Sequence, residues 1–300
     1  MKKVFIAGGI TYDLIINLDT LPQGKAGTLF SSKSKKCVGG TGAGKALNLS
    51  RLGFDTMLHA FVGNDENGKK VKEYMSATKI NFIAETDERG TESFTNLIDK
   101  NGQRISIFTE YNTFNPKFDT TIIEKMIAEA DFIVINIMNY CRNLIPIAKK
   151  YNKEIWCDIH DYDGKSSYYD DFINGANYIF MSSELGVDYK DLMDKFIKQG
   201  KKMVVCTHGK DGADILTNDG KTYSQPIIAG YEKKDVNGAG DSFFSGFLYG
   251  FAKGESIEKS MKYAAINGGL SVTSEELYYT DLTPEKLEEE YMKYFETKTC

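Results

Sequence analysis

The chain has 300 residues, of which 41% are hydrophobic and 26% are charged, and its net charge is −5. This composition is that of an ordinary globular protein and excludes a mainly disordered, collagen-like or coiled-coil chain. Because 37 Lys and Arg stand against 42 Asp and Glu, no basic excess is present to bind phosphate backbones or anionic membranes, so neither nucleic acid nor a membrane is expected as a partner.

The cysteines are scattered along the chain and odd in number: Cys37, Cys141, Cys157, Cys206 and Cys300. They form no C-x-x-C pair, a pattern typical of free thiols in a reducing compartment. The apolar run at 4–7 is too short for a signal peptide, and no run approaches the roughly 18 apolar residues of a membrane span. We therefore expect a cytoplasmic protein.

Short apolar runs alternate with longer amphipathic stretches along most of the chain. Buried strands are predicted at 4–7, 57–62, 132–135, 155–157, 178–181 and 203–207. Helices are predicted at 45–52, 66–77, 144–151, 186–197, 241–252, 257–272 and 284–295. This alternation predicts an α/β protein whose central, mostly parallel sheet is covered by helices on both faces.

Two segments, 12–36 and 93–108, instead alternate apolar and polar residues. In the second, Asn101-Gly102 separates two short strand patterns, which is a strong β-hairpin signal. We expect both segments to form a small β-layer, interpreted as a lid, inserted in a single α/β domain that spans 1–300.

The first glycine cluster, Gly39 to Ala46, comes close to the G-x-x-x-x-G-K-[ST] pattern of a P-loop. Ala46 lacks the hydroxyl that would hold Mg²⁺, and the lysine-rich segment before the cluster is no buried strand. A P-loop that uses Lys45 and a flexible loop that caps the next helix are two alternatives. The preferred interpretation is a backbone platform that a small ligand packs against, because glycines allow close approach.

The second glycine cluster, Gly238-Ala239-Gly240, leads directly into an apolar helix. The unpaired N–H groups and the dipole of a helix start favour an anion, such as a phosphate in transfer. Asp241 lies in the first turn, where a carboxylate can accept a proton from an alcohol that attacks phosphorus. The alternative is that Asp241 only complements the helix dipole.

The stretch Asp235 to Asp241 (D-x-x-G-A-G-D) resembles the C-terminal signature of the ribokinase-like (PfkB-type) carbohydrate and nucleoside kinases. Gly39-Gly40 running into Arg51-Leu52-Gly53 resembles their N-terminal signature, and the similarity covers nearly the whole chain. The resemblance implies a three-layer α/β/α fold with a β-lid. It also implies transfer of the ATP γ-phosphate, with Mg²⁺, to a hydroxyl, usually a CH₂OH, of a small sugar or nucleoside.

The resemblance also implies roles for individual residues. Asp241 matches the catalytic base, and the anion hole matches Gly238, Ala239 and Gly240. Positions that hold the substrate match Asp13, Gly39, Gly40 and Asn139. Positions on the nucleotide side match Thr207, Gly209, Gly212 and Glu184. Asp235 resembles a ligand of a monovalent cation, which would add K⁺ to the cofactors.

Several positions depart from the family pattern. Gly44 stands where many sugar kinases place an Asn, and Met181 replaces the Asn of the Asn-x-x-Glu motif that ends at Glu184. These departures keep open a non-catalytic sensor that binds a nucleotide or a sugar on the same fold. The acidic residues around Asp158 are interpreted as a solvated loop, and an exposed lid edge would allow a homodimer. The sequence does not name the acceptor.

Overall fold

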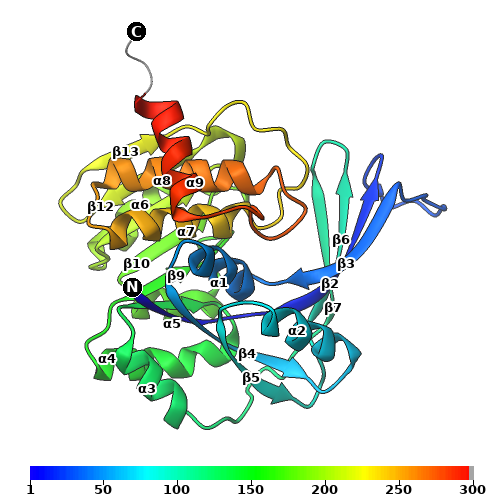
Figure 1. Cartoon of the computed structure of the whole chain (residues 1–300), viewed down its shortest axis with the longest axis horizontal. Coiled ribbons are helices and arrows are strands. Elements are labelled where there is room, and N and C mark those ends of the chain that lie inside the picture. The colour runs from blue at the N-terminus through cyan, green and yellow to red at the C-terminus, as the bar shows by residue number, and fades with distance from the viewer. Residues whose placement is uncertain (297–300) are drawn as a thin grey trace.

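The computed structural model describes residues 1–296, and a twisted sheet runs through the middle of the molecule (Figure 1). Its strands are β1 (Lys3–Ala7), β4 (Asp55–Gly63), β5 (Asn81–Asp87), β8 (Phe132–Asn136), β9 (Ile155–Asp158), β10 (Tyr178–Ser182), β11 (Met203–Thr207), β12 (Ala213–Thr217) and β13 (Thr222–Gln225). Among the described residues the order is β13-β12-β11-β10-β9-β8-β1-β4-β5. Only the pairs that involve β12 and β13 are antiparallel within this described sheet, which confirms the mostly parallel prediction.

Helices cover both faces of this sheet. They are α1 (Thr41–Arg51), α2 (Glu66–Ser76), α3 (Thr121–Glu129), α4 (Ile145–Lys150), α5 (Asp170–Gly175), α6 (Tyr189–Lys198), α7 (Ala239–Ala252), α8 (Ile257–Ser271) and α9 (Pro284–Tyr291). Side chains of a strand alternate between the two faces. Accordingly Val4 and Ile6 enter the core shared with α1, α2 and α7–α9, whereas Phe5 and Ala7 enter the core shared with α3–α6. The result is the predicted three-layer α/β/α arrangement.

The helix predicted at 45–52 begins four residues earlier, at Thr41. Gly40 precedes it with φ +94, a conformation that favours glycine. The amides of Gly42 and Ala43 both donate to the carbonyl of Gly9, so the turn after β1 caps the first turn of α1. The glycine-rich start is therefore helical, and it packs directly against the Gly8-Gly9 turn.

A smaller sheet stands to one side of the main body (Figure 1). It consists of β2 (Thr11–Leu18), β3 (Lys33–Gly39), β6 (Ser93–Asp99) and β7 (Arg104–Glu110), in the order β3-β2-β6-β7. The predicted hairpin joins β6 to β7: Gly102 has φ +76 and its amide donates to the Asp99 carbonyl. The two segments expected to be β-rich thus form one small sheet.

The described cysteines carry free thiols, at Cys37, Cys141, Cys157 and Cys206; Cys300 lies outside the described residues. Burial raises the pKa of Cys206 to about 12 and that of Cys37 to about 11. Over residues 1–296, no helix combines the length and the apolar character needed to cross a membrane.

Candidate active site

The carboxyl ends of the parallel strands meet along one edge of the sheet, where open α/β sheets bind their ligands. The register pairs Asn136 with Asp158 at the ends of β8 and β9, and Ser182 with Thr207 at the ends of β10 and β11. The turn Gly8-Gly9 follows β1 at the same edge. Most of the side chains proposed from sequence therefore follow neighbouring strands.

The start of α7 is built to leave backbone amides free. Gly238 precedes the helix with φ +81, and a Cβ there would lie 2.6 Å from the carbonyl oxygen of Leu277, so only glycine fits. Within the described chain, the amides of Gly240 and Asp241 donate to no other residue. Two free N–H groups at the positive end of a 14-residue helix can accept an anion.

Asp241 lies in the first turn of α7, and its side chain is only 9% exposed. Its Oδ1 accepts a hydrogen bond from Lys45 Nζ at 2.5 Å. Burial raises the pKa of Asp241 above its ordinary value, although the Lys45 ammonium opposes this shift. The sequence pattern placed Asp241 beside free amides, and the described geometry brings the two together.

Lys45 and Asp158 complete a buried cluster with Asp241. Lys45 is 0% exposed, and its Nζ also donates to Asp158 Oδ2 at 3.0 Å. Asp158 is buried rather than part of a solvated loop. Burial disfavours its charge, but the nearby positive charges of His160 and Lys45 prevail and lower its pKa to about 2. Because its ammonium is enclosed between carboxylates, Lys45 does not fit the P-loop alternative.

On the substrate side, Asp13 and Gly39 lie in direct contact. Asp13 Oδ1 accepts from the amide of Phe94 at 2.9 Å, and a Cβ on Gly39 would overlap with Asp13 Oδ2. Gly40 is equally constrained, because a Cβ there would lie 2.6 Å from the carbonyl oxygen of Gly9. Burial raises the pKa of Asp13. Adjacent strands β2 and β3 of the small sheet thus carry these residues to the edge of the main sheet.

Two further polar residues lie at this edge and were not predicted. Glu92 is 4% exposed, and a Cβ on Gly9 would be 3.5 Å from its Oε2. Burial raises the pKa of Glu92 to about 7. Asn136 donates from Nδ2 to the carbonyl of Ala7 at 3.0 Å, while its buried Oδ1 has no partner among the described residues. No local pattern in the sequence marks either residue.

Asn139 uses its amide within the protein. Its Nδ2 donates to the carbonyl of Phe114 at 2.8 Å and to Asn115 Oδ1 at 2.6 Å, and its Oδ1 accepts from Arg142 Nε at 2.7 Å. The side chain therefore anchors the segment that follows the small sheet. A substrate-binding role for Asn139 stays a prediction.

The residues assigned to the nucleotide side gather at the ends of β10 and β11. Thr207 Oγ1 contacts the carbonyl of Met181, and a Cβ on Gly209 would lie 3.9 Å from Glu184 Oε1. Gly212 closes a tight turn: its carbonyl accepts from the amide of His208, and its φ is +98. Glu184 is exposed beside this turn.

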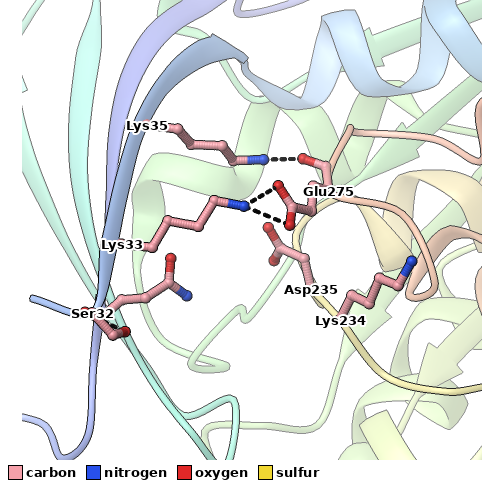
Figure 2. A pocket seen from close by; sticks show the side chains of 7 residues that line it. Ser32, Lys33, Lys35, Lys234, Asp235 and Glu275 are labelled. Atoms are coloured by element: carbon pink, nitrogen blue, oxygen red, sulfur yellow. Dashed lines mark hydrogen bonds and ion pairs between the residues drawn. The ribbon is translucent and has the colours of Figure 1, made fainter.

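Asp235 lies beside a cavity of about 240 Å³ between β3 and the loop before α7 (Figure 2). Lys33 and Lys35 extend from β3 toward Glu275, and Lys33 Nζ lies 2.6 Å from its carboxylate (Figure 2). Lys234 lines the same cavity. These ammonium groups do not suit a monovalent cation beside Asp235, so we derive no step through K⁺, and the role of Asp235 as a cation ligand stays a prediction.

The comparison with protein families gives one match over most of the chain: the family described as pfkB family carbohydrate kinase matches residues 1–284. Among curated proteins, the acarbose 7(IV)-phosphotransferase of Actinoplanes sp. is 27% identical over 275 residues, which cover 90% of this chain and 92% of that protein. The nucleoside kinase of Methanocaldococcus jannaschii is 26% identical over 277 residues, or 86% of each chain.

Solved structures agree with this match. The microbiome-derived acarbose kinase Mak1 has a TM-score of 0.86 and 27% identity, and the alignment covers 96% of this chain and 98% of that one. A putative ribokinase from Agrobacterium tumefaciens, with a TM-score of 0.83 and 19% identity over 98% of both chains, shares the fold. The protein is a carbohydrate or nucleoside kinase, and kinases of this family use ATP, typically with Mg²⁺. The chain belongs to the pfkB family of carbohydrate kinases.

Proposed function

We propose that this protein transfers the γ-phosphate of ATP to a hydroxyl, a CH₂OH group, of a small sugar or nucleoside. The observation that carries the proposal is the position of Asp241 in the first turn of α7, beside the free amides of Gly240 and Asp241. A base and an anion-binding helix start thus adjoin each other, as phosphoryl transfer to an alcohol requires.

In the proposed reaction the acceptor hydroxyl binds Asp241, which accepts its proton as the oxygen attacks the γ-phosphorus. The bond between that phosphorus and the bridging oxygen of ADP breaks, and ADP leaves. The helix start at 238–240 stabilises the negative charge on the transferring group. Asp13, Gly39 and Gly40 would orient the other hydroxyls of the acceptor.

The nucleotide would lie along Thr207, Gly209 and Gly212, whose tight turn exposes backbone to a flat ligand. Glu184 is the exposed carboxylate beside this turn and the residue that would contact Mg²⁺ or its waters. When bound, Mg²⁺ neutralises phosphate charge, while the residues of this chain position the two substrates.

The test is ADP release with Mg²⁺-ATP across a panel of sugars, sugar phosphates and nucleosides. Asp241→Asn is expected to lower turnover by about 10²–10⁴-fold, because a general base is lost, and to leave ATP binding nearly unchanged. Asp194→Asn is the matched control, since Asp194 is exposed in α6. If Asp241→Asn keeps the kcat of the unaltered protein, Asp241 is not the base.

A non-catalytic sensor is the second candidate, favoured by Met181. This side chain is 3% exposed and packs in the core beneath α6, so it offers the nucleotide no polar group. The sensor predicts nucleotide binding by calorimetry with no ADP release for any acceptor. Turnover that depends on a sugar or nucleoside and disappears in Asp241→Asn excludes it.

A homodimer through the small sheet, with a cytoplasmic location, completes the proposal. All residues of β7 are exposed, and β7 lies at the edge of its sheet in the described chain. Such an edge can pair with a second copy. Light scattering at micromolar concentration tests this: a monomeric mass would exclude the dimer.

A further inference from the structure

Lys45 takes no part in the transfer as written above, yet it is one of the largest fully buried side chains of the described protein. Its Nζ donates to Asp241 Oδ1 at 2.5 Å and to Asp158 Oδ2 at 3.0 Å, and lies 5.2 Å from the centre of the Phe244 ring. An ammonium excluded from water is tolerated only when it is paired and hydrogen-bonded. Its position is therefore fixed by carboxylates on two different elements.

The charges around Asp241 depend on this lysine. The ionisable groups that face Asp241 are Lys45 from α1, and Asp158 and His160 from the end of β9. Two carboxylates that share a buried site without a cation cannot both stay ionised, and one of them keeps a proton. A protonated Asp241 could not accept the proton of an acceptor hydroxyl.

Gly44, the residue before Lys45, allows α1 to approach this carboxylate. A Cβ at position 44 would overlap with Asp241 Oδ2. Two consecutive residues of α1 thus contact the same side chain: Gly44 leaves space for one carboxylate oxygen, and Lys45 donates to the other.

We propose that Lys45 is a positioning residue that keeps the Asp241 carboxylate ionised and aligned, and that Asp158 anchors the lysine. This inference rests on the proposed role of Asp241 as the base. Lys45 does not touch the acceptor, and it retains its proton throughout the transfer. Asp158 lies on the far side of the ammonium and adds a second negative charge.

The proposal predicts opposite effects for two variants. Lys45→Gln keeps a hydrogen-bond donor but removes the positive charge, so Asp241 should titrate at a pH higher by about 1 unit or more. Asp158→Asn removes a negative charge, so Asp241 should titrate at a lower pH. A merely structural role would destabilise both variants without moving this titration in opposite directions.

The experiment follows the carboxyl carbons by NMR in the full-length protein labelled with [¹³C]aspartate, without any substrate. The Asp241 signal is the one absent from Asp241→Asn, and Lys195→Gln, at an exposed site in α6, is the matched control. Thermal melts establish that each variant folds. If Lys45→Gln fails to fold, Asp158→Asn still tests the proposal, because an unchanged or higher titration pH overturns it.

The pH profile of kcat/KM with the fastest acceptor of the panel gives the second readout. In Lys45→Gln the acid limb should move to higher pH, so that kcat at pH 6 falls about tenfold or more while the KM for ATP is unchanged. Unmoved limbs with an inactive Asp241→Asn overturn the role of Lys45 alone. An active Asp241→Asn overturns the proposed base, whatever the NMR titration shows.

Discussion

Gly44 shows how a missing side chain determines the geometry of the candidate base. Because a Cβ at this position would overlap with Asp241 Oδ2, Gly44→Ala must displace the carboxylate. A displacement of about 1 Å is enough to lower kcat on the order of 10²-fold. The fold should survive, since alanine is favoured over glycine inside a helix by about 1 kcal/mol. ADP release and a thermal melt measure the two effects.

Gly268→Ala is the control for that substitution. Gly268 lies inside α8, where a Cβ would make an ordinary contact of 3.5 Å with the carbonyl oxygen of Ala239. This variant should fold and keep its kcat. Full activity in Gly44→Ala would mean that the carboxylate tolerates displacement, and would contradict the geometry assigned to Asp241.

The sequence was informative about this site only where its signal was local. The spacing around Gly238 and Asp241 predicted a helix start with an acid in its first turn, and the described structure has both. Lys45 and Asp158 were visible but were given other roles, a P-loop lysine and a solvated loop. Their contacts join residues 196 and 113 positions apart, and no spacing rule encodes such pairs.

At the scale of elements, Asp65 ties a helix to a loop. It precedes α2, its Oδ1 accepts from the amide of Gly68 at 2.7 Å, and its Oδ2 accepts from the amide of Thr91 at 2.7 Å. Asp65→Ala should lower the free energy of unfolding by about 1–2 kcal/mol at pH 7, because a capping side chain is lost. Urea unfolding measures this, and Asp65→Asn, which preserves a cap, should cost less.

The same residue predicts a pH dependence. Partial burial works to raise the pKa of Asp65, but hydrogen bonds from Gly68 and Thr91 prevail and lower it. A lowered pKa in the folded state means that the stabilisation is present above the ordinary value of 3.8 and is lost as the pH falls through the folded value. The gap between Asp65→Ala and the unaltered protein should therefore narrow in acid. A constant gap would contradict the charged cap.

Elements with strong periodicity were predicted, and weakly patterned ones were missed. The six predicted strands and seven predicted helices all occur among the described residues, with shifted ends. The sequence analysis did not predict β5, β12, β13, α3 or α5. β5 and β13 lie at sheet edges and are mostly half-exposed, so their apolar alternation is blurred, and α5 has only six residues.

At the scale of the molecule, Glu92 couples stability to pH. Burial raises its pKa from 4.5 to about 7, so the folded protein keeps a proton that the unfolded chain releases. Its contribution to stability is therefore fully present below pH 4.5 and is lost as the pH rises through about 7. The free energy of unfolding should fall between pH 5 and pH 8, by about 2–3 kcal/mol from this group.

Glu92→Gln isolates this effect. The variant should be more stable than the unaltered protein at pH 8 and should show a flatter dependence between pH 5 and pH 8, as measured by urea unfolding. Glu258→Gln, on an exposed residue, should leave the dependence unchanged. Equal slopes for Glu92→Gln and the unaltered protein would mean that Glu92 is ionised in the folded state.

The order in which the two faces of the sheet are covered has a consequence for synthesis. Helices α3–α6 all precede residue 199, so one face can be covered while the chain is still emerging from the ribosome. On the other face Trp156 and Phe180 pack against Phe244 and Phe247 of α7, which emerge much later. A nascent chain therefore carries a broad apolar surface until its last quarter is made, and a chain truncated before α7 should need a chaperone to stay soluble.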